Sequence, residues 1–455
     1  MKKHSQSMLN GPLLPSIISY TIPIILTSLL QLLFNAADLV VVGRFCGSIS
    51  VAAVGATGSI TSLVVNLFLG ISLGAGVTVA HGLGAKEEDG VHKTVHTAVP
   101  TALIGGGILT IIGVVFAEDF LLMMGTPESV LPLSTLYMQI YFGGMVFNML
   151  YNFCASILRA AGDTKSPLIF LTLSGVINVG LNLVFVMVLH MNVAGVALAT
   201  TIAQGVSAVL VVITLMRRKD CCRLQLRKLR FYKVQFLKII RIGLPAGIQS
   251  SLFAISNVII QSSINSFGEV AMSGNAAAGN IDSFLYVIFN AFHQTTVNFV
   301  GQNVGAHQYA RAKKTLYTCL SCVVALGVVF CTLAYLFAPQ LLSIYITDSP
   351  EAITYGVLRM SVICLTYFLC GLMETTTGAL RGMGASMIPM VISVLGVCGV
   401  RLGWIFTVFQ IPQFHTPLWL YISYPVSWAF TFGAQLFAFI KVYKERTQTL
   451  AAKSE

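Results

Sequence analysis

Long runs of apolar residues alternate along the chain with short polar segments. An α-helix rises 1.5 Å per residue, so about 20 residues are needed to cross the roughly 30 Å hydrocarbon core of a bilayer. Twelve runs of suitable length can be marked, at residues 15–42, 52–80, 94–116, 132–157, 167–189, 193–216, 243–266, 270–300, 314–338, 353–378, 388–411 and 417–440. The pattern predicts an all-α polytopic membrane protein with twelve transmembrane helices.

An internal repeat relates the two halves of this pattern. The segment GSISVAAVGATGSITSL, from Gly47, matches GEVAMSGNAAAGNIDSF, from Gly268, and LRAAGDTKSP (158–167) matches LRGMGASMIP (380–389). The offset covers six predicted helices, an even number, so both copies have the same orientation in the membrane. We therefore expect two six-helix bundles related by a parallel (6+6) repeat, an arrangement typical of secondary transporters.

The repeat also predicts how the chain is divided. We expect a cytoplasmic N-terminal tail (1–14), an N-terminal bundle (15–216), a basic cytoplasmic linker (217–242), a C-terminal bundle (243–440) and a cytoplasmic tail (441–455). The tail MKKHSQSMLNGPLLP lacks the cleavage pattern of a signal peptide, so we expect it to be retained. The basic linker suits a segment that lies on an anionic membrane surface.

Composition and charge agree with this topology. The 455 residues are 56% hydrophobic and only 9% charged, which lies outside the range of soluble globular proteins. The net charge is +11, but all 27 basic residues except Arg44, Arg359 and Arg401 fall in the tails and loops expected to be cytoplasmic. This positive-inside bias predicts that both termini are cytoplasmic. It also explains the positive net charge, so no nucleic-acid partner is inferred from that charge.

A carboxylate in the first apolar run is the clearest candidate for function. A charge at bilayer depth costs about 2.5–3.5 kcal/mol on insertion scales, so Asp38 is expected to have a role. Gln31, Asn35 and Asp38 are spaced i, i+4 and i+7, which places them on one face of the predicted helix.

Further polar residues of the first half map to the same depth as this carboxylate. Asn178, Asn182 and either Thr200 or Thr201 fall in the outer half of their predicted helices. We expect these groups to converge with Asp38 in one cavity. The structural alternative is a buried polar network that only locks the helices together.

The second half contains two acids within its apolar runs, Asp282 and Glu374, and one base at mid-depth, Arg401. Two interpretations of Glu374 remain open: a static ion pair with Arg401, or a part in substrate binding or coupling. His293, on the same predicted helix as Asp282, is interpreted as a hydrogen-bonded core histidine, with a proton relay as the alternative.

Several of these segments together resemble the multidrug and toxic compound extrusion (MATE) family over residues 12–440. They are LFNAADLVVVGR in the first run, GLGA and QNVGA after the second and eighth, and the paired segments LRAAGDTKSP and LRGMGASMIP. The resemblance implies an antiporter of the inner (cytoplasmic) membrane that exports cationic or amphipathic organic compounds, including drugs, in exchange for protons or sodium ions. It further implies a cation or proton site centred on Asp38.

The sequence departs from many family members at one position of that site. Asn178 and Asn182 stand where many members have an Asn-x-x-x-Asp pair, so the second carboxylate is missing here. Desolvation of Asp38 would favour a bound proton, or a sodium ion held with the two asparagines as oxygen donors. No other metal and no cofactor is expected, and the repeat needs no oligomer, so we expect a monomer.

Other functional classes fit the sequence less well. A flippase for lipid-linked saccharides, of related architecture, would be expected to need several basic residues at mid-depth, where Arg401 stands alone. A membrane-embedded transferase would be expected to carry paired aspartates, yet neither DxxD nor DDxxD occurs, so the chain is not expected to be an enzyme. An ion channel would be expected to contain a filter-like run, and none is present.

Overall fold

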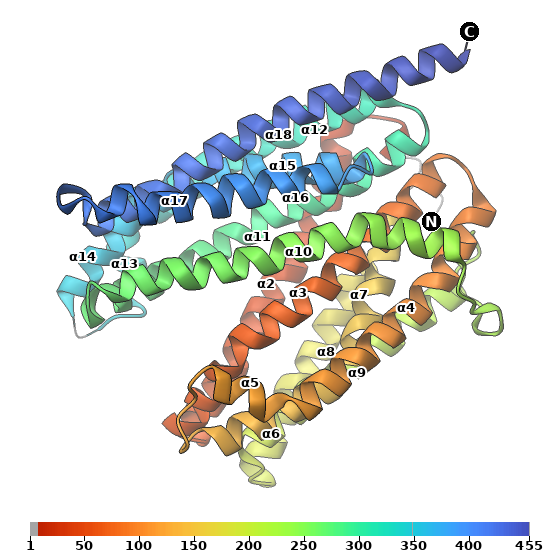
Figure 1. Cartoon of the computed structure of the whole chain (residues 1–455). Helices are drawn as coiled ribbons and strands as arrows, with labels where there is room; N and C mark the ends of the chain where they lie inside the picture. Colours follow the sequence, from red (N-terminus) through yellow and green to blue (C-terminus); the bar gives the residue numbers. More distant parts are fainter. Residues whose placement is uncertain (1–7, 348, 455) are drawn as a thin grey trace. The chain divides into compact units, whose positions relative to one another are not determined.

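The computed structural model describes residues 8–347 and 349–454, and every regular element within these ranges is a helix (Figure 1). Residues 1–7 of the predicted N-terminal tail lie outside the described residues. In the described ranges, nine helices are long and apolar enough to cross a membrane, and two bent helix pairs raise this number to eleven. α11 (Glu269–Gly305) is a further long helix, and its many polar side chains reduce its hydropathy.

Each predicted run overlaps one helix or one broken helix. In the first half these are α2 (Leu13–Phe45), α3 (Ser48–Gly84), α4 (Glu88–Val115), α6 (Leu131–Gly143) with α7 (Met145–Ala160), α8 (Lys165–Leu183) with the π-helix η1 (Val184–Val188), and α9 (Asn192–Arg217). In the second half they are α10 (Lys233–Asn265), α11, α12 (Tyr309–Leu336), α14 (Pro350–Arg359) with η3 (Met360–Cys364) and α15 (Tyr367–Gly382), α16 (Met387–Ser393) with η4 (Val394–Gly399) and α17 (Val400–Phe406), and α18 (Pro417–Ser454).

Two short helices, α5 (Ala117–Met123) and α13 (Ala338–Ser343), follow α4 and α12 at equivalent places in the two halves.

The repeat is visible in the backbone as well as in the sequence. Gly47 and Gly268 precede α3 and α11 with positive φ angles of 88° and 90°, a conformation that side chains with a Cβ rarely adopt. Lys86 and His307, which follow the matched GA pairs, have φ angles of 56° and 58°. The broken helices bend by 45° in the first half and 43° in the second. These equivalences support the predicted fold of two repeated bundles.

The described residues form two compact units, one of residues 22–251 and one of residues 8–21 with 252–454. The division falls inside α2 and α10, since the first part of each helix packs in a different unit from the rest. In the second unit, Thr21 Oγ1 lies 2.8 Å from Thr295 Oγ1 of α11, and the Tyr20 ring meets Phe299 edge-on at 5.4 Å. In the first unit, α10 crosses α3 so closely that a Cβ on Gly247 would lie 2.2 Å from the carbonyl oxygen of Leu67.

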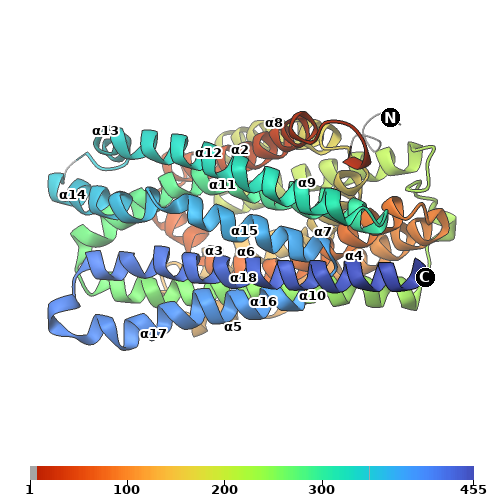
Figure 2. The same ribbon diagram turned by 90° about the horizontal axis from the view of Figure 1, so that it is seen from above.

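The helix at the centre of each unit is the second one of its bent helix pair. In the first unit α7 packs against α3, α4 and α9, and in the second its repeat equivalent α15 packs against α11, α12 and α18. Figure 2 shows α12, α15 and α18 running along a common direction. Residues 370–382 of α15 are all buried, so polar groups on this helix are enclosed by its neighbours.

The basic linker belongs to the first unit. His96 Nε2 on α4 accepts a hydrogen bond from the backbone N–H of Gln225 (3.0 Å), and Thr97 Oγ1 accepts one from that of Tyr232 (3.2 Å). Cys222 and Leu224 are buried in the core of this unit. The linker therefore packs against α4, whose side chains accept two of the hydrogen bonds that the linker backbone donates.

Candidate functional site

Asp38 lies in a polar cluster formed by α2, α8 and α9. Asn182 Nδ2 donates to Asp38 Oδ1 at 2.5 Å, and the Thr200 hydroxyl lies 3.4 Å from Asp38 Oδ2. Asn178 Nδ2 donates to Thr200 Oγ1 (3.2 Å), and its Oδ1 accepts from Asn182 (3.3 Å). Four side chains from three helices thus form one connected network around a half-buried carboxylate.

The local sequence of α8 explains this convergence. Gly175, Asn178 and Asn182 are spaced i, i+3 and i+7 and so share a face. A Cβ on Gly175 would lie 1.8 Å from the ring of Phe34, so the glycine lets α2 approach α8 closely. The same approach brings Asp38, one helical turn beyond Phe34, to the two asparagines.

Thr201 does not join this cluster. Its Oγ1 donates to the backbone carbonyl of Ile140 (3.3 Å), and its side chain packs against Gly144. Successive residues of a helix point about 100° apart. Of the two candidate threonines, only Thr200 therefore faces Asp38.

Gln31 and Asn35 lie on the same helix as Asp38, and both are exposed. Within the described residues no carboxylate, histidine or thiol group adds to Asp38 to make a cluster of three metal-binding side chains. The donor set is one carboxylate with neutral amide and hydroxyl oxygens. Asn182 Oδ1 is buried and accepts no hydrogen bond from any described residue, so it is available to a cation.

In the second unit, Asp282 of α11 is paired with an arginine of α14. Arg359 Nη2 lies 2.9 Å from Asp282 Oδ2, and Arg359 Nη1 donates to the backbone carbonyl of Asn275 (2.5 Å). Gly279 leaves room for this guanidinium, since a Cβ there would lie 2.8 Å from Nη1. The charge of Asp282 is therefore balanced within the bundle.

Glu374 of α15 lies beside His293 of α11. The imidazole Nδ1 is 3.4 Å from Glu374 Oε2 and 2.7 Å from the Glu374 carbonyl oxygen, and Nε2 is 3.2 Å from Arg381 Nη1. Because arginine only donates, Nε2 must accept, and Nδ1 carries the proton that it donates to the Glu374 carbonyl. Gly378 permits this contact, as a Cβ there would lie 2.6 Å from the His293 carbonyl oxygen.

The ion pair considered between Glu374 and Arg401 does not form. Arg401 of α17 instead donates from Nε to Ser427 Oγ (2.9 Å), and its guanidinium carbon lies 4.1 Å and 5.4 Å from the ring centres of Tyr424 and Trp428. The reason is that α17 packs against α18, which supplies these three residues.

Sequence reasoning overlooked two buried arginines. From the sequence alone, Arg359 has no assigned partner and Arg381 is placed in a cytoplasmic segment, but their side chains reach inward to Asp282 and His293. A signal for Arg359 was available, because it is one of the three basic residues that break the positive-inside bias. Arg381 gave no such signal, since its backbone lies where cytoplasmic charge is expected.

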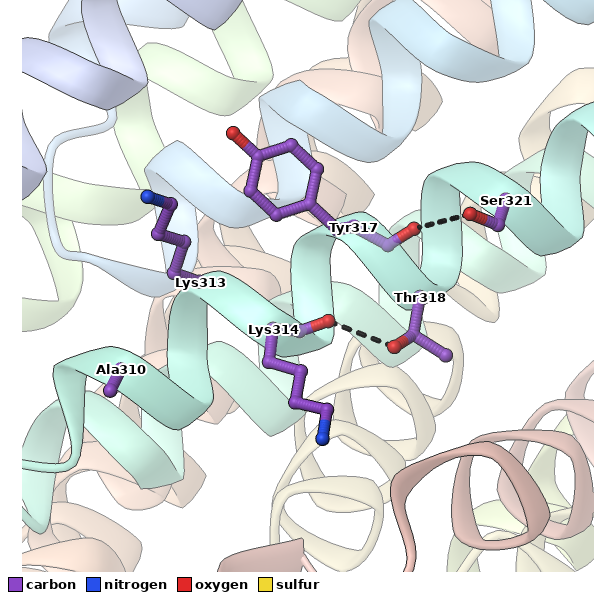
Figure 3. A pocket seen from close by; sticks show the side chains of 6 residues that line it. All are labelled: Ala310, Lys313, Lys314, Tyr317, Thr318 and Ser321. Carbon is purple, nitrogen blue, oxygen red and sulfur yellow. Dashed lines mark hydrogen bonds between the residues drawn. The ribbon is translucent and has the colours of Figure 1, made fainter.

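A shallow depression also lies along the first turns of α12 (Figure 3). It is lined by Ala310, Lys313, Lys314, Tyr317, Thr318 and Ser321. The aliphatic hydroxyls of Thr318 and Ser321 already donate to backbone carbonyls of the same helix at 2.9 and 3.0 Å (Figure 3). We assign no function to this surface.

Comparison with known proteins finds relatives over nearly the whole chain. A probable multidrug resistance protein, YoeA of Bacillus subtilis, is 27% identical, with 90% of this chain and 90% of that protein covered. An FAD transporter of Shewanella oneidensis is 24% identical, with 86% and 87% covered. A crystal structure of a MATE protein in complex with MaL6 superimposes with a TM-score of 0.89 at 19% identity, covering 98% of this chain and 99% of that one.

The family model described as MatE matches the chain twice, once in each half. The matched residues are 23–184 and 245–406, and the two matches begin 222 residues apart, the offset that also relates the LRAAGDTKSP and LRGMGASMIP segments. Together the matches cover more than half of the chain. The chain therefore belongs to the MatE family of membrane transporters and has its all-α fold of twelve transmembrane helices in two repeated bundles.

Proposed function

We propose that this transporter is a multidrug exporter of the inner membrane that exchanges cationic or amphipathic organic compounds for protons or sodium ions by alternating access. Asp38 is the residue that binds the coupling ion, and both termini are cytoplasmic. The names of several relatives, as multidrug resistance or export proteins, support drug efflux. One relative is named an FAD transporter, which supports amphipathic compounds besides simple cations.

The observation that carries the coupling proposal is the network around Asp38. Neutral hydrogen-bonding groups are sufficient to hold helices together. This network instead contains a carboxylate that has no basic partner among the described residues. A half-buried negative charge without a basic partner is stabilised by taking up one positive charge. The cluster therefore suits the binding of a monovalent cation.

The residues present suit either coupling ion. For a proton, Asp38 is the acceptor, and Asn182 and Thr200 remain hydrogen-bonded to the neutral acid. For sodium, Asp38, Asn178, Asn182 and Thr200 together offer carboxylate, amide and hydroxyl oxygens, which hard cations prefer. Asn182 Oδ1 accepts no hydrogen bond from any described residue, so it can serve as a sodium ligand without breaking one.

Exchange follows from the change of charge at this cluster. With the ion bound, the cluster is neutral and α2 can pack against α8 and α9 without a buried charge. With the ion released, the carboxylate favours packing that exposes it to water or to a cationic compound. Two packings of different ion affinity are sufficient to couple ion entry to drug release.

The flippase alternative is weakened by the partners of the buried bases. Arg359 is paired with Asp282, and Arg381 contacts His293, so neither is free for a pyrophosphate group. Of these three arginines, only Arg401 contacts neither an acid nor a histidine within the described part of the chain. One guanidinium is fewer than such a headgroup would be expected to need.

The decisive experiment is dye transport by Asp38→Asn in everted membrane vesicles, under an imposed pH gradient and, separately, a sodium gradient. The amide keeps the size and hydrogen bonds of the protonated acid. We expect normal insertion and a loss of gradient-driven transport of at least tenfold, because the cluster no longer changes its charge.

The exposed Asp119→Asn on α5 is a matched control and should transport normally. The gradient that drives the wild-type chain identifies the coupling ion. Undiminished transport by Asp38→Asn under both gradients would show that Asp38 does not couple.

A further inference from the structure

Arg401 is a buried cation whose hydrogen-bonding capacity is mostly unused. Its side chain has only 4% of its surface exposed, and Nε alone donates a hydrogen bond, to Ser427. The two terminal nitrogens donate to no described residue, yet they are not among the fully enclosed unpartnered atoms. The two terminal nitrogens of the guanidinium therefore lack a hydrogen-bond acceptor among the described residues.

No carboxylate of the described chain balances this charge. Asp282 is paired with Arg359, and Glu374 contacts His293. The interior of this unit, within the described residues, thus holds three arginines, Arg359, Arg381 and Arg401, but only two carboxylates, Asp282 and Glu374. A buried charge without a partner costs several kcal/mol, so its retention requires a compensating interaction.

Aromatic rings contact the guanidinium but offer no hydrogen-bond acceptor to its terminal nitrogens. Tyr424 and Trp428 lie 4.1 and 5.4 Å from its carbon, and Tyr367 continues the cluster at 5.3 Å from Trp428. These cation–π contacts restrain the orientation of the guanidinium plane and leave its two terminal nitrogens without an acceptor. The two terminal nitrogens can donate parallel hydrogen bonds to the two oxygens of a carboxylate. The neighbouring rings can pack against a flat aromatic group of the same compound.

We propose that Arg401, held on Tyr424 and Trp428, binds the carboxylate of transported planar aromatic compounds. This inference deepens the proposed drug export and rests on it, since it defines the chemical class of one group of substrates. Such compounds are zwitterions or amphipathic anions whose acidic group supplies the missing negative charge.

The test uses two dyes that differ only in this group. Rhodamine B has a free carboxylate, and rhodamine B ethyl ester has the same aromatic cation with the acid esterified. Binding of each dye to the full-length chain in nanodiscs is measured by fluorescence anisotropy. We expect the wild-type chain to bind rhodamine B at least tenfold more tightly than the ester.

Substitutions then assign the preference to the guanidinium. Arg401→Gln should weaken rhodamine B binding at least tenfold while changing ester binding less than twofold. Arg401→Lys keeps the charge but not the pair of terminal nitrogens. Its affinity for rhodamine B should lie between those of the wild-type chain and Arg401→Gln. Arg44→Gln, at the exposed end of α2, is the matched control and should keep the full preference.

Three outcomes would overturn the proposal: no preference or no rhodamine B binding in the wild-type chain, a preference that survives Arg401→Gln, or an equal loss of both dyes in that variant. Dye binding needs no ion gradient, so Asp38→Asn should retain the preference. Failure of coupling at Asp38 and failure of carboxylate binding at Arg401 are therefore distinguishable.

Discussion

At the scale of single residues, each acid inside the second unit has a basic neighbour on the adjoining helix. Asp282 meets Arg359, and Glu374 meets His293, while Arg401 stands apart on an aromatic face. Removal of one partner leaves the other buried without compensation, which costs about 3–5 kcal/mol for a fully buried pair. The loss of stability caused by a substitution at these positions therefore depends on which residue is its partner.

A double-mutant cycle tests these contacts. Glu374→Gln and His293→Gln, alone and together, should show an interaction energy of about 0.5–3 kcal/mol in thermal unfolding of the detergent-solubilised chain, because the side chains share a network. Glu374→Gln with Arg401→Gln should be additive to within about 0.5 kcal/mol. A large interaction energy in the second cycle and none in the first would contradict the observed contacts.

At the scale of elements, two proline-containing helices connect the compact units. Pro23 lies inside α2 and Pro245 inside α10, and they are related by the offset of 222 residues that separates the family matches. Each lies within a few residues of the point where its helix passes from one unit to the other. A proline inside a helix removes one backbone hydrogen bond and weakens the helix locally. These positions are therefore suited to bend.

Removal of either proline should slow transport without preventing ion binding. We expect Pro23→Ala and Pro245→Ala to reduce the initial rate of gradient-driven dye efflux several-fold, because restoring the missing hydrogen bond stiffens the connecting helix. Pro100→Ala on α4 is the matched control, since that helix lies wholly within the first unit. Equal rates in all three variants would exclude a role for helix bending at these prolines.

The helices could be predicted from the sequence more completely than their contacts. Apolar runs located every spanning helix, but not the start of α10 at Lys233 or the end of α18 at Ser454, because helical turns outside the membrane need no apolar residues. Depth along the predicted helices placed Asn178, Asn182 and a threonine at the level of Asp38. It did not separate Thr200 from Thr201, since that distinction depends on how α9 is rotated about its axis.

Charge pairing was the least predictable feature of the candidate sites. Two interpretations of Glu374 were open, and the pairing with Arg401 was wrong because partners are decided by which helices are neighbours. An arginine side chain is also long enough to reach from a helix end into the bundle, as Arg381 does. A sequence pattern fixes the depth of a backbone position, not the depth of the charge it carries.

At the scale of the whole molecule, the proposed orientation can be tested with two native thiols. Cys46 follows α2 and Cys221 lies in the linker, both half-buried, whereas Cys222 is fully buried. A hydrogen bond from Cys222 lowers the pKa of the Cys221 thiol, so more of it is thiolate at a given pH. Membrane-impermeant maleimide should label Cys221 only in everted vesicles and Cys46 only in intact cells.

The labelling also has an expected pH dependence. Cys221 should remain reactive below the range of an ordinary thiol, whose pKa is about 8.5, because its thiolate persists as pH falls. Variants that retain either Cys46 or Cys221, and that always keep the buried Cys222, are analysed by mass shift to provide the measurement. Labelling of both residues from the same side would contradict the assigned topology.

The packing of the first part of α2 has a consequence for biosynthesis. Tyr20 and Thr21 of α2 are translated long before their contacts, Phe299 and Thr295, since Thr295 lies 274 residues beyond Thr21. At about 5–20 residues per second, translation of that interval takes roughly 14 to 55 s. During this time the face of α2 that carries Tyr20 has no native partner, so the nascent chain depends on lipid or on insertion factors to cover it. The native packing of this part of α2 is thus completed only after α11 has been synthesised.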